Sequence, residues 1–318
     1  MKTLFSFLGL LFLKSIFAQI PQISYQDFGY EKQVSKVEIM LYDFKDKVVV
    51  DNQKEELIFN KEGNIASIKT TFFSNNSIVE EKYSYENNLL FNRKQFLNQQ
   101  KEPVSTSLFG YNNQAKISEI QINEKEKKTI CLFSYNDDNQ INEVNKKFEN
   151  SYQYEKFEYD ENNQLWKKQL NYFEKDTVSF TSEDLIIENK LAADISSEKK
   201  YIKFYTYGEN SNEISRLDID KNKISNEFLN LCDLINDKNM STSDFRKFIL
   251  GIKDVKVITK ETFLKNEFGD WLVNYYYDNL HSEITQYYFK KIIYADGTIS
   301  GDSEFNIFKV NEVKSLAK

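Results

Sequence analysis

The sequence is poor in the residues that build catalytic centres, metal sites and rigid loops: its 318 residues include one histidine, two cysteines, two prolines and nine glycines. So little proline and glycine excludes collagen-like and proline-rich linker classes. A single histidine, His281, does not by itself make a zinc site or a catalytic triad, and Cys131 and Cys232 lack the close spacing of a metal ribbon. Nucleophile-elbow, Walker and dinucleotide-binding motifs are absent. We therefore expect no enzyme activity, catalytic residue, metal or cofactor.

Positive charge is also scarce, because the net charge is −7 and arginine occurs only at Arg93, Arg216 and Arg246. Nucleic-acid binders carry a basic surface that neutralises phosphates. This composition therefore excludes nucleic acid as a partner.

The only long apolar run is N-terminal and is typical of a secretory signal peptide. Lys2 supplies the charged start, Leu4 to Leu13 the apolar segment, and Ala18 a small residue before a cleavage site at Gln19. The run is too short for a membrane span, and no second one follows. No cysteine follows the cleavage site, so a lipid anchor is not expected. We predict export to the periplasm or cell surface without a transmembrane segment.

Export permits a disulfide, yet two cysteines do not make a disulfide framework. Two alternatives follow for Cys131 and Cys232: two buried thiols, or one bond between them.

Aromatic residues are abundant, with 26 Phe and 20 Tyr, and they recur in a repeat. Each unit reads aromatic, any residue, Tyr or Phe, a cluster of Asn, Asp, Glu or Gly, and then an aliphatic residue. Successive anchors are separated by 26, 26, 24, 24 and 48 residues, and they are Phe59, Tyr85, Tyr111, Tyr135, Tyr159 and Tyr207.

The physical chemistry of one unit predicts a β-hairpin. Alternate aromatics place both rings on one face of a strand, and the Asn/Asp/Gly cluster supplies positive φ for a tight reversal. In the second strand the aliphatic residues are three apart, as in Ile65 and Ile68. Either a bulge intervenes there or both faces are partly covered. One hairpin is marginal in water, so we predict a mainly β fold: an array of antiparallel hairpin repeats of about 24 residues, forming an extended or wrapped sheet.

These units resemble the YD repeats of the RHS family, in which an aromatic-x-Tyr-Asp phrase precedes Gly or Asn and an aliphatic residue. Tyr159-Asp160 matches best, and Tyr277-Asp278 is a second match. The turns depart from the family by carrying Asn where it prefers Gly. The resemblance implies an exported β-repeat protein that wraps, scaffolds or binds, in some members carbohydrate.

Near residue 224 the apolar period changes to that of helices. We predict helices at 224–236 and 242–250, the second capped by Ser241 and ending at Gly251, as a small two-helix insertion. The predicted organisation is a signal peptide at 1–18, strands and hairpin repeats at 19–220, the helical insertion at 221–253 and a C-terminal hairpin unit at 254–318.

The tyrosines are the feature with functional potential. A row of rings is either core or, if exposed, a surface for stacking sugars or receiving a partner; the candidate binding aromatics are Tyr85, Tyr111, Tyr135, Tyr159 and Tyr207. We interpret the acidic pairs Glu80-Glu81 and Asp137-Asp138, and the incomplete calcium loop at Asp218, as structural. The favoured function is a non-enzymatic binding or scaffold module of the cell envelope, with carbohydrate or another envelope protein as partner. The alternatives are an envelope hydrolase with a hidden carboxylate pair and a shell or carrier fragment related to RHS toxin-delivery proteins.

Overall fold

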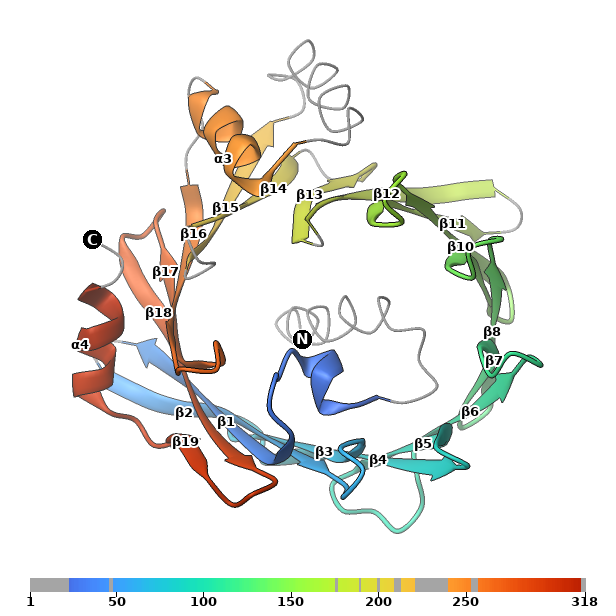
Figure 1. The fold of residues 1–318 in the computed structure, drawn as a ribbon, viewed down its shortest axis with the longest axis horizontal. Coiled ribbons are helices and arrows are strands. Elements are labelled where there is room, and N and C mark those ends of the chain that lie inside the picture. The colour runs from blue at the N-terminus through green and yellow to red at the C-terminus, as the bar shows by residue number, and fades with distance from the viewer. Residues whose placement is uncertain are drawn as a thin grey trace. The chain divides into compact units, whose positions relative to one another are not determined.

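The structure is a computed structural model that describes residues 23–45, 48–174, 177–188, 190–198, 201–208, 213–220, 240–252 and 257–315 (Figure 1). The predicted signal peptide and the predicted helix at 224–236 lie outside these residues, as does Cys232. The chain divides into two compact units. Unit 1 comprises the described residues of Met1–Leu132, Phe263–Tyr275 and Gln286–Leu316, and unit 2 those of Phe133–Thr262 and Tyr276–Thr285.

The described elements are mostly strands, which confirms the mainly β prediction. A 3-10 helix, η1, spans Tyr25–Phe28, and two α-helices follow late in the chain, α3 at Thr242–Gly251 and α4 at Ile307–Ser315. The first strands are β1 Val34–Lys45, β2 Val48–Phe59, β3 Ile65–Phe72, β4 Ser77–Glu86, β5 Leu89–Leu97, β6 Ser105–Tyr111, β7 Ile117–Glu124, β8 Lys127–Tyr135 and β9 Ile141–Lys147. The later strands are β10 Ser151–Tyr159, β11 Leu165–Glu174, β12 Thr177–Ile187, β13 Lys190–Ser196, β14 Tyr201–Tyr207, β15 Glu213–Asp220, β16 Val257–Lys265, β17 Trp271–Asp278, β18 Glu283–Tyr294 and β19 Ile299–Gly301.

Each strand pairs antiparallel with its neighbour in sequence, from β1 to β8 in unit 1 and from β9 to β16 in unit 2. In unit 1, β1 pairs with β2 along one edge and with β18 along the other, so that Val37 lies opposite both Leu57 and Ile292. The strand that begins the sheet therefore has no free edge.

This pairing overturns the predicted extended or wrapped array of separate hairpin repeats. Strands of successive hairpins are also hydrogen-bonded to one another, as β5 and β6 are from Asn92 to Gln95. The first strand also meets one of the last, β18. A local repeat specifies hairpins, but it carries no signal for a pairing between segments about 250 residues apart.

A recurrent five-residue turn joins the paired strands at 60–64, 112–116, 136–140, 160–164 and 266–270. Its first residue is Asn or Asp, whose side-chain oxygen accepts the backbone N–H four residues later, at 2.8–3.0 Å. Its fourth residue has positive φ, and the five are Gly63, Ala115, Asn139, Asn163 and Gly269. Asn and Gly tolerate this conformation, so the predicted turn chemistry is confirmed.

A bulge follows three of these turns and also the turn at 87–88, and it resolves the alternative left open for the second strands. Phe59 lies opposite Ile65 while Ile58 lies opposite Ser67, which leaves Ala66 as the extra residue. The same shift leaves an extra residue after Leu90, Ile117 and Leu165. The bulge adds one residue to the second strand only, which explains the spacing of three.

The core of unit 1 lies where β1, β2, β3 and β18 meet the N-terminal residues. Its buried members are Tyr30, Val34, Val37, Leu57, Phe59, Ile65, Ile292 and Tyr294. Phe28 and Tyr30 meet Phe59 edge-to-face, at centroid distances of 5.6 and 6.5 Å. This aromatic packing fixes the start of the described chain on the sheet.

The core of unit 2 forms beneath α3, which lies on β14 (Figure 1). The helix begins after Ser241, whose side chain accepts the N–H of Asp244, and it buries Phe245 and Ile249 against Phe204. The helix predicted at 242–250 is therefore confirmed. Gly251 is the last helical residue, and the cap beyond it is Ile252 in an extended conformation.

Candidate functional site

The predicted binding tyrosines occupy equivalent places in the sheet. Tyr85, Tyr111, Tyr135 and Tyr159 stand at or next to the ends of β4, β6, β8 and β10, and Tyr207 ends β14. All five are half-buried. We call the sheet face that carries these side chains the tyrosine face.

The hydroxyl groups of four of these five tyrosines donate hydrogen bonds to the backbone. Each of four donates to the carbonyl oxygen of an aliphatic residue near the start of an earlier strand: Tyr85 to Ile65 at 3.0 Å, Tyr111 to Leu90 at 2.7 Å, Tyr159 to Ile141 at 2.8 Å and Tyr207 to Leu191 at 2.9 Å. Burial raises the pKa of Tyr159 to about 12. The row therefore links successive hairpins, and a ligand would meet ring surfaces rather than phenol groups.

A second row lies four residues before each of the first five anchors, on the same face. The repeat fixes its position but not its chemistry, since its members are Glu55, Glu81, Ser107, Cys131 and Glu155. Four of them are 5% exposed or less, and the side chain of Glu81 is 14% exposed. Buried carboxylates require compensation, which the structure supplies unequally.

Glu155 is well compensated. Its carboxylate contacts Lys146 at 2.5 Å and Lys168 at 3.2 Å, and Gln153 donates to it. Burial opposes ionisation, but the two ammonium groups outweigh it and lower the pKa of Glu155.

Glu55 is poorly compensated. Glu55 is 5% exposed, and none of the described residues forms a hydrogen bond or ion pair with its carboxylate. Burial, reinforced by the charge of Glu81 and opposed by Lys290, raises its pKa from 4.5 to about 7. Glu81 itself accepts from Tyr83 at 2.5 Å and Gln95 at 3.2 Å, and lies 3.9 Å from Arg93.

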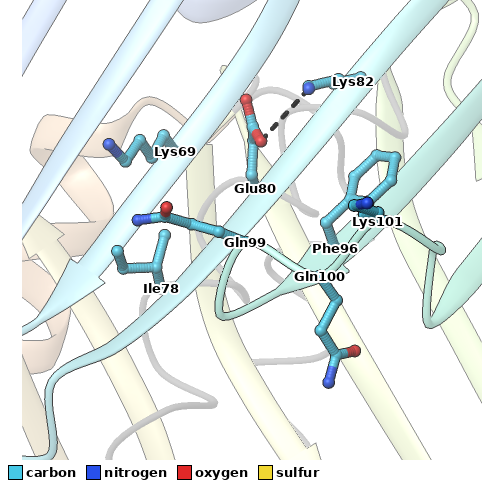
Figure 2. Close-up of a pocket in the computed structure, with 8 residues that line it drawn as sticks. All are labelled: Lys69, Ile78, Glu80, Lys82, Phe96, Gln99, Gln100 and Lys101. Carbon is cyan, nitrogen blue, oxygen red and sulfur yellow. Dashed lines mark ion pairs between the residues drawn. The ribbon is translucent and has the colours of Figure 1, made fainter.

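The opposite face of unit 1 carries a depression of about 560 Å³ over β3, β4 and β5 (Figure 2). We call it the lysine depression; its lining residues are Lys69, Ile78, Glu80, Lys82, Phe96, Gln99, Gln100 and Lys101. Lys69, Glu80 and Phe96 form one cross-strand row, because Glu80 lies opposite Lys69 on β3 and opposite Phe96 on β5. The segment after β5 adds the two glutamines and Lys101.

Charge and ring surface are arranged together in this depression. Lys82 lies 3.4 Å from Glu80 and 5.1 Å from the centre of the half-buried Phe96 ring. Three lysines against one glutamate leave an excess of positive charge. The arrangement can bind an anionic ligand that also offers an apolar surface and hydrogen-bonding groups.

Other positions singled out in the sequence have structural roles. Glu80 and Glu81 point to opposite faces of β4 and do not form an acid pair. Asp137 and Asp138 are exposed in a hairpin turn. Asp218 binds the Arg216 guanidinium through both carboxylate oxygens, at 2.6 and 2.8 Å.

Two further sequence features are settled in part. His281 is exposed in a turn, where its Nδ1 donates a hydrogen bond to the Asp278 carboxylate at 2.8 Å, and this bond raises the pKa of the imidazole. Cys131 is buried on the tyrosine face. Whether Cys131 is a free thiol or is bonded to Cys232 stays open as predicted from the sequence, because Cys232 lies outside the described residues.

None of the helices in the described part of the chain is long and apolar enough to cross a membrane. The described residues also include no group of three or more His, Cys, Asp or Glu side chains that could hold a metal ion.

No family model matches the sequence, and no curated protein matches it. The resemblance to YD repeats therefore stays a prediction. Among solved structures, a porin-like protein from Bacteroides uniformis is 10% identical over 83% of this chain and 98% of its own, with a TM-score of 0.40. A porin-like protein from Bacteroides vulgatus is 10% identical over 83% of this chain and 99% of its own, with a TM-score of 0.30. The TcdB2-TccC3-Cdc42 structure is 7% identical over 80% of this chain and 15% of that chain, with a TM-score of 0.32. Likenesses this distant carry no information on function.

The lysine depression was not anticipated from the sequence. Lys69, Glu80 and Phe96 come from three strands, and only the register brings them into one row.

Proposed function

We propose that the protein is an exported, non-enzymatic binding module of the cell envelope, and that the lysine depression binds acidic carbohydrate. The observation that carries this proposal is the placement of Lys82 beside both Glu80 and the Phe96 ring, with Lys69 and Lys101 at the same depression. A uronic acid presents a carboxylate to the ammonium groups, C–H groups to an aromatic ring, and hydroxyls to glutamine amides and a carboxylate. Export is proposed from the N-terminal signal sequence.

An acidic segment of another envelope protein is the competing ligand, since it would also meet the lysines. It lacks the sugar's combination of apolar ring face and dense hydroxyls. The Phe96 ring and the two glutamines therefore favour carbohydrate.

Isothermal titration of the protein with tetragalacturonate tests the proposal. Lys82→Gln and Lys101→Gln should each weaken binding by about threefold to tenfold, since the net contribution of a solvent-exposed hydrogen bond is about 0.5–1.5 kcal/mol and about 1.4 kcal/mol corresponds to tenfold. Phe96→Leu should weaken it as well. Lys128→Gln is the matched control, because Lys128 is exposed on β8 and is not among the lining residues.

Tetraglutamate serves as the second probe. Binding of tetraglutamate as tight as that of tetragalacturonate, and unaffected by Phe96→Leu, would favour an acidic protein partner. If the protein binds neither tetragalacturonate nor tetraglutamate, the proposed site is refuted.

Among the described residues, Glu55 and Glu81 are a candidate pair for the alternative of a hydrolase with a hidden carboxylate pair, because the charge of Glu81 raises the pKa of Glu55. Glu55 lines neither of the two depressions described in unit 1. Binding is therefore the function that the geometry supports better.

A further inference from the structure

A second depression, of about 450 Å³, lies between neighbouring hairpin turns of unit 1. We call it the asparagine depression; its lining residues are Asn60, Glu62, Asn64, Ala66, Tyr83, Tyr85, Asn87 and Asn88. Its volume falls within the roughly 300–1,000 Å³ of small-molecule sites. In contrast to the lysine depression it contains no basic side chain.

The lining holds one buried polar group with an unmet hydrogen bond. Asn64 is 2% exposed, and its side-chain oxygen has no hydrogen-bond partner among the described residues. Its backbone N–H is already held by Asn60 at 2.9 Å. A buried acceptor left without a donor costs about 1–3 kcal/mol, so a hydroxyl donor at this position would be favourable.

The remaining groups are divided into apolar surface and hydrogen-bonding side chains. Tyr83 and Tyr85 direct their hydroxyls to Glu81 and to the Ile65 carbonyl, which leaves their rings as apolar lining. No described hydrogen bond involves the side chains of Glu62, Asn87 or Asn88, which are exposed at the two turns. Amides both donate and accept, whereas a carboxylate accepts and repels anions.

We propose that the asparagine depression is a binding site for a neutral hexose oligosaccharide, separate from the acidic-carbohydrate site. Sugar hydroxyls donate to Asn64 and Glu62 and exchange hydrogen bonds with Asn87 and Asn88, and the C–H face of the ring packs on Tyr85. The excess of acceptors over cations excludes uronic acids here. This inference does not depend on the proposed function of the lysine depression.

The turn geometry provides variants that remove side chains without disturbing the fold. Asn87 and Asn88 have φ values of 50° and 64°, a conformation that glycine adopts at no steric cost. Asn87→Gly/Asn88→Gly therefore deletes both amides and keeps the turn. Asn139→Gly is the matched control, since Asn139 has φ 65° in a turn of unit 2.

Saturation-transfer NMR with cellohexaose, maltohexaose and mannohexaose tests the proposal on the full chain, with circular dichroism as the check of folding. At least one probe should bind the native protein. The double glycine variant should weaken that binding by about tenfold, corresponding to two hydrogen bonds, and Glu62→Gln by a few-fold. Asn139→Gly and Lys82→Gln should have no effect.

The proposal is overturned if no probe binds, if the double glycine variant binds as the native protein does, or if Asn139→Gly weakens binding equally. Loss of neutral-sugar binding in Lys82→Gln would move the site to the lysine depression and also overturn it. Tetragalacturonate binding is read separately, so either site can fail while the other stands.

Discussion

Glu55→Gln should make the protein more stable at pH 8 and leave its stability almost unchanged at pH 4. Burial and the charge of Glu81 raise the pKa of Glu55 from 4.5 to about 7 in the folded protein. The folded state therefore binds this proton more tightly than the unfolded state. The contribution of Glu55 to the free energy of unfolding is therefore greatest below pH 4.5, is lost as the pH rises from 4.5 to about 7, and is constant above that.

The magnitude follows from the change in proton affinity. A tenfold change corresponds to about 1.4 kcal/mol, so the ionised carboxylate lowers the free energy of unfolding by about 3 kcal/mol above pH 7. Glutamine has the same shape and no charge, so it resembles the protonated acid. The variant should gain up to about 3 kcal/mol at pH 8.

Urea unfolding of the native and variant proteins at pH 4, 6 and 8 measures this difference. Glu155→Gln is the matched control with the opposite sign, because the same change leaves Lys146 and Lys168 without their carboxylate. That control should lose at least about 1 kcal/mol at pH 8. A Glu55→Gln variant that is less stable than the native protein at pH 8, or whose gain does not grow between pH 4 and pH 8, would refute the reasoning.

Three further predictions concern the turns, the tyrosine row and the lysine depression. Ala115→Gly should raise the free energy of unfolding by about 0.5–1 kcal/mol, because Ala115 has φ 58°, and Asn139→Ala should lower it; urea unfolding measures both. Tyr159→Phe should lower stability by about 1 kcal/mol through loss of the hydrogen bond to Ile141, whereas Tyr152→Phe, whose ring stacks on Phe173, serves as the comparison. Binding of tetragalacturonate should weaken several-fold when the salt concentration rises from about 0.05 to 0.5 M, while binding of a neutral hexaose should not change.

Local features of the fold were predictable from the sequence because they depend on neighbouring residues. The Asn and Gly residues of the turns and the alternate aromatics specify each hairpin, and the spacing of three after Ile65 reported the bulge. Helix α3 was predictable from Ser241 and the spacing of Phe245 and Ile249.

The pairing of β1 with β18 was not predictable, because the sequence around Val37 contains no signal that specifies pairing with Ile292, about 250 residues away. The candidate sites share this difficulty. Lys82 and Phe96 become neighbours only through the register of β4 and β5. The asparagine depression lies between two adjacent turns, and the sequence of each turn alone predicts only a hairpin turn.

The repeat also indicates where function should be sought. At the anchor position the chain keeps an aromatic ring, and the hydroxyls of Tyr85, Tyr111 and Tyr159 hold the backbone of an earlier strand. A residue kept for that purpose cannot distinguish one ligand from another. Four residues earlier the side chain changes from unit to unit, between carboxylate, hydroxyl, thiol and, before Tyr207, the ammonium group of Lys203, and the turn residues change as well. Specificity in a repeated sheet can arise only where the repeat varies. The asparagine depression combines both kinds of position, since it joins the invariant ring of Tyr85 to turn residues that differ from those of the other hairpins.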